Sequence, residues 1–192
     1  MSAALLHKLA SASFFAGSCL ALNSCEALKF IRGQAGIRKA QIAQARVETN
    51  SLVIALHAYH DDHASLPSVE DPENDVHMTT GTELMGVLTG MDKDGNPRQE
   101  RYFQGPEAVD GKGGLSWEAG KDGQRSVRLL DPWGNEYHLL FDSDFDDEIA
   151  DPFDRAKRLF GRKAIAWSAG PDGKTNPEAR HEDNADNVFS WK

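Results

Sequence analysis

The sequence predicts an α+β protein in which a long N-terminal helix packs on a small antiparallel sheet with long loops. The helix is predicted because the stretch from about Glu26 to Asp62 contains no proline and repeats apolar residues every three, four or seven positions. The sheet is predicted because short apolar runs follow, separated by loops rich in Gly, Asp and Pro.

The long helix is expected to have two different halves. Gly33 and Gly36 weaken the front half, because glycine disfavours a helix interior. The back half, residues 47–59, is more apolar and is expected to pack on the rest of the domain. Leu66-Pro67 ends the helix, because the residue before a proline avoids the helical conformation. The apolar stripe consists of Leu28, Ile31, Ala35, Ile42, Ala45, Thr49, Leu52, Leu56 and Tyr59.

The rest of the chain alternates short elements with loops. Residues 80–88 are predicted to form a short helix, and Asp131-Pro-Trp-Gly-Asn135 is a strong turn between two strands. Trp133 and Tyr137 are expected to pack this hairpin onto the long helix, and a contact between Trp133 and a neighbouring subunit is the alternative. Strands are expected at 101–103, 126–130, 136–141, 164–167 and 188–191. Loops are expected at 68–79, 90–100 and 104–123, with an acidic loop at 142–154.

The first 27 residues differ in composition from the rest of the chain. The run from Leu9 to Cys25 carries no charged residue, and it is too short and too weakly apolar for a membrane-spanning helix. We expect residues 1–27 to form an export signal or a weak membrane anchor. Leu22-Asn-Ser-Cys25 also looks like a degenerate lipobox, which would make Cys25 a lipidated N-terminus. An ordinary amphipathic helix start is the alternative.

The remaining residues, 28–192, are expected to form one domain, with a long helix at 28–62 and a head at 63–192. Both cysteines, Cys19 and Cys25, precede this domain. The domain therefore holds neither a disulfide framework nor a cysteine-based zinc site.

The composition disfavours several classes of function. A formal net charge of −9 argues against a nucleic-acid partner, because neutralising phosphates requires a basic surface. The sequence contains no Gly-x-Ser-x-Gly nucleophile motif and no phosphate-binding glycine loop. No catalytic residue is singled out, so we expect a protein that is not an enzyme.

The C-terminal loop between Trp167 and Trp191 is crowded with hard oxygen ligands. Asp172, Asp183 and Asp186 offer carboxylates, and two glycines allow the chain to turn so that backbone carbonyls point inward. Calcium takes about six to eight oxygen ligands. The spacing is not that of an EF-hand. From the residues alone, a calcium site and an acidic surface loop are both open.

Three stretches follow one another in a recognisable order. The long helix ends in Leu52-Val-Ile-Ala-Leu-His-Ala-Tyr-His-Asp-Asp-His-Ala-Ser-Leu-Pro67, and Asp131-Pro-Trp-Gly-Asn-Glu-Tyr137 follows. The third stretch is Trp167-Ser-Ala-Gly-Pro-Asp-Gly173, continued by Asp183-Asn-Ala-Asp186 and Trp191. Over roughly residues 40–192 the chain thereby resembles the soluble head of the major, G-type pseudopilin of bacterial type II secretion, within the type IV pilin-like superfamily.

The resemblance implies a structural role and a calcium site. In that family the third stretch binds one calcium, which here implies Asp172 and Asp186 as side-chain ligands and Ala169 as a carbonyl ligand, with Asp183 as a further candidate. The implied partners are other pseudopilin subunits, including copies of this chain, and an inner-membrane secretion platform. The implied location is the bacterial cell envelope, at the inner membrane or in the periplasm. The family's Gly-Phe-x-x-x-Glu start is absent from this sequence.

Two other functions stay open at this point. A secreted metal-binding protein or metal-dependent enzyme would use His57 and His60, or the acidic run that starts at Asp142. A solvated helix end and a solvated hairpin tip are the plainer interpretations of the same residues. A lipidated Cys25 would instead indicate a monomeric lipoprotein adaptor with a pseudopilin-like head.

Overall fold

The chain divides into two compact units, Met1–Ala40 and Gln41–Lys192, which are described separately. The export signal, anchor or lipidated start expected at 1–27 lies outside the residues with described side chains. No helix in the described part of the chain is long and apolar enough to span a membrane. The computed structural model describes residues 16–67, 74–120, 123 and 125–192, with side chains from residue 33 onward.

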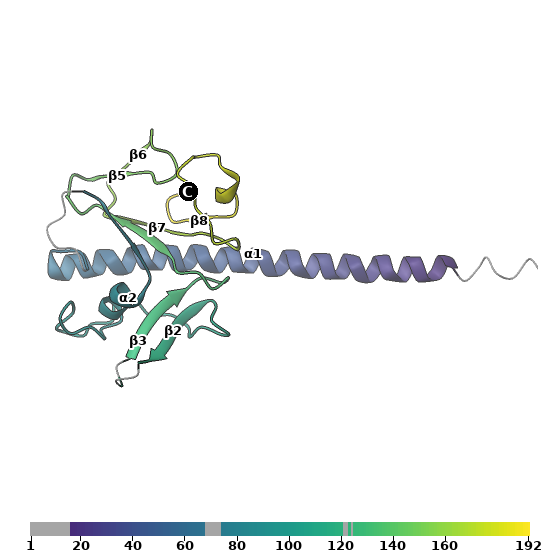
Figure 1. Ribbon diagram of the computed structural model, residues 1–192, viewed down its shortest axis with the longest axis horizontal. Helices are drawn as coiled ribbons and strands as arrows, with labels where there is room; N and C mark the ends of the chain where they lie inside the picture. The colour runs from purple at the N-terminus through teal and green to yellow at the C-terminus, as the bar shows by residue number, and fades with distance from the viewer. Residues whose placement is uncertain (1–15, 68–73, 121–122, 124) are drawn as a thin grey trace, which may run out of the picture. The chain divides into compact units, whose positions relative to one another are not determined.

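Helix α1 comprises Ala16–His63 and is the longest element of the protein (Figure 1). It begins earlier than the predicted start at Glu26, because residues 16–25 contain no proline to interrupt a helix. Its end agrees with the prediction. Ala64 leaves the helical conformation with a φ of 51°, and Pro67 follows. Within the first unit, residues 33–40 are all exposed.

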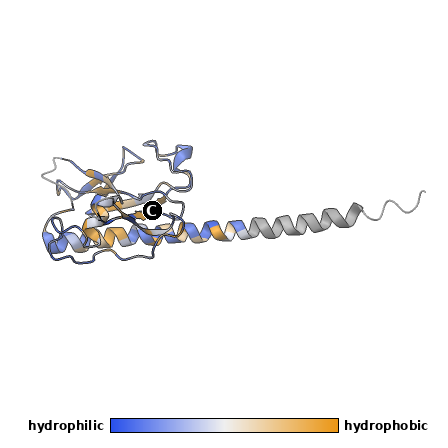
Figure 2. Cartoon of the chain, turned by 60° about the horizontal axis from the view of Figure 1, so that its bottom comes forward, coloured by the Kyte–Doolittle hydropathy of each residue, from blue (hydrophilic) through white to orange (hydrophobic). Residues whose placement is uncertain are grey.

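Within Gln41–Lys192, α1 buries one face and exposes the opposite one. The exposed face carries Val47 and Ile54, which are 65% and 67% exposed. Apolar residues recur along this part of the helix in Figure 2. The buried residues keep the spacing of three, four or seven positions that the sequence predicted, so the apolar stripe in this unit is confirmed. The buried apolar residues are Ala45, Leu52, Ala55, Leu56 and Tyr59, and Thr49 of the predicted stripe is buried with them.

The main sheet has four antiparallel strands in the order β1-β4-β7-β8. Leu139 and Phe141 alternate along β4, are fully buried, and belong to the same apolar core as the buried face of α1. A long helix packed on an antiparallel sheet confirms the predicted α+β class. The strands are β1 Val76–Thr79, β4 His138–Phe141, β7 Ala164–Ser168 and β8 Val188–Phe189.

Strand β7 is buried along its whole length because both faces of the sheet are covered there. The small Ala164 and Ala166 face the core that contains α1. Ile165 points to the other face, where it packs with Ile149 and Leu159 in a second apolar cluster. A strand buried on both faces reads as a continuous apolar run rather than an alternating one, which is what Ala164–Trp167 shows.

The remaining elements are short and sit around this sheet. Figure 1 shows α2 beside the β2–β3 hairpin. Four apolar residues of α2 are buried, namely Leu84, Met85, Val87 and Leu88. The elements are α2 Thr82–Leu88, β2 Gly114–Ala119, β3 Arg125–Leu130, β5 Glu148–Ala150, β6 Arg158–Phe160 and the 3₁₀ turn η1 Glu182–Asn184.

The structure differs from the predicted elements in two ways. The strand expected at 101–103 is absent. Phe103 is buried there, and its backbone N–H donates to the Leu88 carbonyl over 2.9 Å, but residues 101–103 do not pair with a strand. Conversely, the loops expected at 68–79, 104–123 and 142–154 contain β1, β2 and β5. These strands are partly polar, and their pairing partners rather than their own pattern make them strands.

The expected packing of the turn at 131–137 on the long helix is confirmed. Tyr137 is fully buried, and its hydroxyl donates a hydrogen bond to the carboxylate of Glu48 on α1. Trp133 is half-buried against the same core. The Gln41 side chain donates from Nε2 to the Pro132 carbonyl over 3.4 Å.

Candidate functional site

The turn at Asp131 holds the start of the C-terminal loop. Oδ1 of the fully buried Asp131 accepts hydrogen bonds from the backbone N–H of Trp133, Gly134 and Asn135, each at 2.9 Å. Oδ2 of Asp131 accepts a 2.6 Å hydrogen bond from Oγ of Ser168. These contacts join two of the three sequence stretches that carry the resemblance, although no local pattern predicts that they touch.

A second contact reaches from the turn to the loop itself. Nδ2 of Asn135 donates to the Gly170 carbonyl over 2.9 Å. Gly170 has a φ of 70°, and a Cβ at that position would lie 2.6 Å from the Asp186 carbonyl oxygen and 3.0 Å from Asp186 Cγ. Only glycine permits this approach. The beginning and the end of the loop therefore meet at Gly170 and Asp186.

The predicted calcium ligand Ala169 lies where two carbonyl oxygens converge. With its amide nitrogen turned toward them, Asn187 donates to the Ala169 carbonyl at 2.9 Å and to the Lys174 carbonyl at 3.2 Å. Asp186 adjoins Gly170, so its carboxylate belongs to the same region. Backbone carbonyls and carboxylates are the donor types that calcium prefers. A calcium ion held by these two carbonyls would take the place of the Asn187 amide nitrogen.

The other two predicted ligands make local contacts instead. Oδ1 of the exposed Asp172 accepts from the backbone N–H of Lys174 at 2.9 Å. Asp183 lies in η1, where its carboxylate is 3.2 Å from Nδ1 of His181. The carboxylates of Asp172, Asp183 and Asp186 are not gathered into one group of three within ligand distance in the described part of the chain.

The segment within the loop that precedes η1 is closed by its own hydrogen bonds. Nδ2 of Asn184 donates to the carbonyls of Asn176 and Glu178 at 2.8 and 2.9 Å. Oδ1 of Asn184 accepts from the Asn176 backbone N–H at 2.9 Å. One asparagine side chain thus connects Asn176 and Glu178 to η1.

An aromatic cluster covers the outer face of the sheet next to the loop. The rings of His77, His138 and Trp167 stack, with centroids 5.3 Å apart for the two histidines and 5.2 Å apart for His138 and Trp167. Trp191 meets Trp167 edge-on at 6.0 Å. The two tryptophans that bracket the loop therefore close it by packing.

The two histidines of the cluster favour their neutral form. Burial lowers the pKa of His77. Burial, and after it the charge of His77, lowers the pKa of His138.

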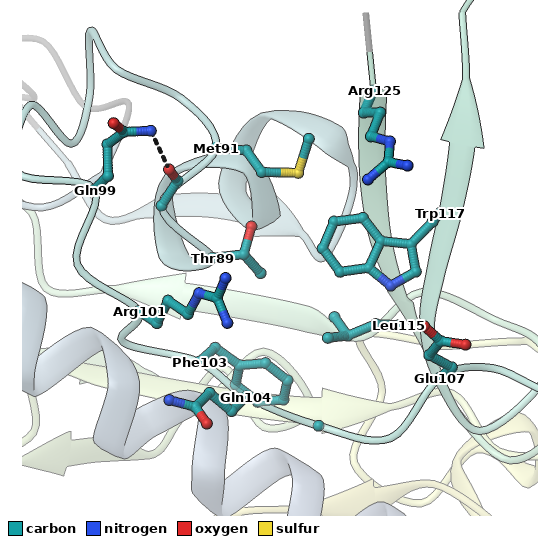
Figure 3. A pocket seen from close by; sticks show the side chains of 12 residues that line it. Thr89, Met91, Gln99, Arg101, Phe103, Gln104, Glu107, Leu115, Trp117 and Arg125 are labelled. Atoms are coloured by element: carbon teal, nitrogen blue, oxygen red, sulfur yellow. Dashed lines mark hydrogen bonds between the residues drawn. The ribbon is translucent and has the colours of Figure 1, made fainter.

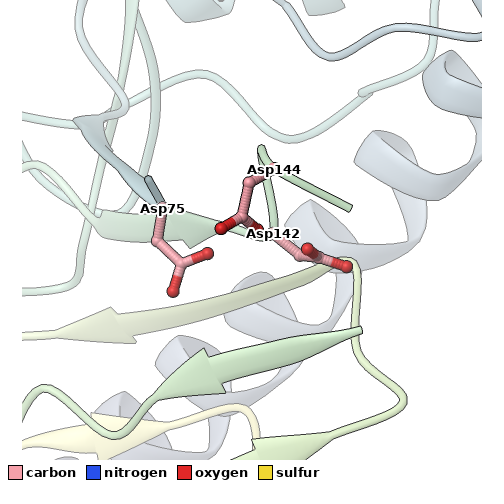
Figure 4. Close-up of side chains that lie close together, drawn as sticks. All are labelled: Asp75, Asp142 and Asp144. Carbon is pink, nitrogen blue, oxygen red and sulfur yellow. The ribbon is translucent and has the colours of Figure 1, made fainter. Parts of the chain in front are cut away.

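A second group of oxygen ligands lies at one end of the sheet (Figure 4). Asp75, Asp142 and Asp144 each place one carboxylate oxygen so that all three atoms lie within 4.8 Å of one another. Asp142 is fully buried, and its Oδ2 is 3.4 Å from Nζ of Lys163. Oδ1 of Asp142 and Oδ1 of Asp75 are buried and have no hydrogen-bond partner among the described residues.

The environment of Asp75 disfavours its charged form. The pKa of Asp75 is raised to about 6, and burial is the largest cause. A hydrogen bond from the backbone N–H of Ala150 lowers this pKa, whereas the carboxylates of Asp144, Asp142 and Asp146 contribute to its rise. The sequence singled out the acidic run from Asp142, but Asp75 reaches it only through the pairing of β1 with β4. Residues 144–147 are exposed, as a solvated tip requires, whereas Asp142 is not.

The histidines at the end of α1 are not gathered around a metal site in the described part of the chain. His57 is exposed. His60 lies 3.7 Å from the carboxylate of Asp61, and the ring of His63 stacks on Tyr59 at 4.3 Å. Nε2 of His63 is 3.2 Å from the Tyr102 hydroxyl. These contacts suit a partly packed helix end.

An open cavity of about 720 Å³ lies between the end of α2 and the β2–β3 hairpin (Figure 3). Arg101 and Arg125 border it, together with the aromatic rings of Phe103 and Trp117. Glu107 is the one carboxylate among its described lining residues, which include no histidine or cysteine. The cavity thus lacks an acid–base pair of the usual kinds.

Oxygen ligands gather in the C-terminal loop and in the Asp75, Asp142 and Asp144 group. The Asp75, Asp142 and Asp144 group suits a hard cation rather than zinc, because it contains no histidine or cysteine ligand, whereas the loop also carries His181 beside Asp183. Comparisons with protein-family models, with curated proteins and with solved structures find no match to this chain.

Proposed function

We propose that this chain is a structural, non-enzymatic protein of pseudopilin type with a calcium-stabilised C-terminal loop. It would serve as a subunit of a bacterial type II secretion pseudopilus or as a pseudopilin-derived envelope protein. Its location would be the bacterial cell envelope, at the inner membrane or in the periplasm. The observation that carries the proposal is the meeting of Gly170 with Asp186 beside the converging carbonyls of Ala169 and Lys174.

Calcium would be held by the Ala169 carbonyl and by the carboxylates of Asp172 and Asp186, with Asp183 as a further ligand. When bound, the ion would supply the attraction that holds loop segments with little apolar surface in one conformation. Asp131, Ser168 and Asn135 would position the loop for this, through the hydrogen bonds that tie it to the turn. A cation that binds only the folded state stabilises it by about 2.7 kcal/mol at roughly 100 times its Kd.

The exposed face of α1 supports a role in assembly. Val47 and Ile54 are seven positions apart and mostly exposed, and Ser51 and Ala58 lie on the same side of the helix. An apolar and small-residue stripe that the chain's own core does not cover suits packing against the helix of a neighbouring subunit. The partners would be other pseudopilin subunits, including copies of this chain, and the inner-membrane secretion platform.

Calcium binding is tested by thermal unfolding of the full chain with calcium and with excess EDTA. We expect the wild-type Tm to rise with calcium, and the rise to be smaller in Asp172→Asn and in Asp186→Asn. Asp94→Asn is the matched control, because Asp94 is exposed and lies in another loop. Equal Tm values of the wild type in calcium and in EDTA would remove the calcium claim.

Assembly is tested by sedimentation velocity over a range of concentrations. We expect self-association of the wild type, and its loss in the double variant Val47→Lys and Ile54→Lys at unchanged Tm. Val109→Lys is the control, since Val109 is 72% exposed but lies in the head. A wild type that stays monomeric, together with an N-terminus found acylated at Cys25 by mass spectrometry, would favour the adaptor instead.

A further inference from the structure

We infer that Asp75, Asp142 and Asp144 form a binding site for a hard divalent cation, separate from the C-terminal loop. None of these residues takes part in the function proposed above. The site would take calcium or manganese, because all three ligands are carboxylates.

The distances suit one shared ion. Oxygens bound to a single calcium at about 2.3–2.6 Å are at most roughly 5 Å apart. One oxygen from each of the three aspartates lies within 4.8 Å of the other two. In Figure 4, Asp75 approaches from one side and Asp142 from the other, with the Asp144 carboxylate between them.

Strand pairing holds the three aspartates in place. Val76 on β1 pairs with Phe141 on β4, so Asp75 and Asp142 are the next residues outward on neighbouring strands. Oγ of Ser143 accepts a hydrogen bond from the Val76 backbone N–H at 3.2 Å. This contact fixes the chain between Asp142 and Asp144 against β1. Two of the ligands therefore lie directly beyond the paired ends of β1 and β4, and this rigid position favours a defined geometry.

A buried atom without a partner points independently to a ligand. Asp142 is 0% exposed, and its Oδ1 accepts no hydrogen bond from the described residues. A buried carboxylate oxygen is normally hydrogen-bonded or bound to a metal, since burying it unpaired costs free energy. Lys163 contacts the other oxygen, Oδ2, and leaves Oδ1 free.

The charge balance also matches a divalent ion. Above the raised pKa of Asp75, the three carboxylates carry three negative charges and face one ammonium group, that of Lys163. The Lys163 side chain is 36% exposed and also lies 4.0 Å from Asp147. Two negative charges are therefore left without a nearby positive one. Asp144 is exposed, so an ion can reach the three carboxylates from solvent. Water molecules on that side would complete the coordination of the ion.

The test measures binding of CaCl₂ or MnCl₂ to the full chain by isothermal titration calorimetry. All variants are made in a background chain that carries Asp172→Asn and Asp186→Asn. In this background the C-terminal loop no longer contributes the carboxylates of these two predicted ligands. We expect one remaining cation per chain, and roughly tenfold or more weaker binding after Asp144→Asn or Asp75→Asn. Asp154→Asn is the matched control in the neighbouring hairpin, and it should bind like the background.

Each outcome decides the inference. Equal binding by Asp144→Asn and Asp154→Asn would overturn it, as would a background chain that binds neither cation. Since Asp144 is exposed, its substitution should leave the fold intact, and circular dichroism of each variant checks this. Failure of the loop site shows up separately, as equal stoichiometry in the wild type and in the background.

Discussion

Ser168 donates a hydrogen bond from Oγ to Oδ2 of Asp131 over 2.6 Å, and neither side chain is exposed to solvent. Asp131 belongs to the turn before β4, and Ser168 is the last residue of β7. The contact therefore ties the turn to the point where the C-terminal loop begins. The start of the loop is therefore oriented by a hydrogen bond between two buried residues, and not only by contacts among the loop residues.

The first prediction concerns Asp131. Replacing it with alanine should lower the free energy of unfolding by roughly 3–5 kcal/mol, because three backbone donors and Ser168 lose their acceptor in a buried place. Asp131→Asn keeps an acceptor for the backbone donors and should cost less. Urea unfolding measures both, and equal costs for the two variants would contradict this account.

The second prediction compares two neighbouring positions on α1. Leu56 is 0% exposed and Ile54 is 67% exposed. Leu56→Ala should cost about 2–5 kcal/mol, because it leaves a cavity in the core. Ile54→Ala should stay within about 0.5 kcal/mol, since most of the Ile54 side chain is exposed to solvent. Urea unfolding of the monomer at low concentration checks the difference, and a reversed order would mean that the helix presents the other face to the head.

The third prediction concerns the pH dependence that Glu48 contributes. Burial raises the pKa of Glu48 above the ordinary value of 4.5, hydrogen bonds from Tyr137 and Gln44 lower it, and the charge of Asp131 raises it. The folded state therefore binds the proton more tightly than the unfolded state. Stability from this group is present below pH 4.5 and is lost as the pH rises through the raised pKa.

This loss is measured as the difference in unfolding free energy between the wild type and Glu48→Gln from pH 4 to pH 7. The wild type should lose stability relative to the variant as the pH rises. In the Tyr137→Phe background the loss should be larger, because the hydroxyl that stabilises the carboxylate is gone. A difference that does not change with pH would show that Glu48 titrates alike in both states.

The predicted elements agree with the structure where neighbouring residues determine them. The stripe through Leu52, Leu56 and Tyr59 is buried as its spacing predicts, and the turn at Asp131 forms where Pro and Gly require it. The strand at Val76–Thr79 was missed, because its pattern is too polar to identify it and its pairing with Phe141 lies outside any local window. Phe103 is buried but does not belong to a strand, which its apolar sequence does not reveal.

For the functional sites the division is similar. The calcium site stays a prediction, with Ala169, Asp172, Asp183 and Asp186 as its ligands. It is supported by the short distance between Gly170, which follows Ala169, and Asp186. Asp142 was noticed as part of an acidic run, but its burial was not.

The sequence by itself determined the α+β class, the buried face of α1 and the oxygen-rich loop, because periodicity, turns and composition act over a few residues. Only the tertiary structure decided that Asp75 meets Asp142 and that Ser168 meets Asp131, because strand pairing brings together residues that no local interaction relates.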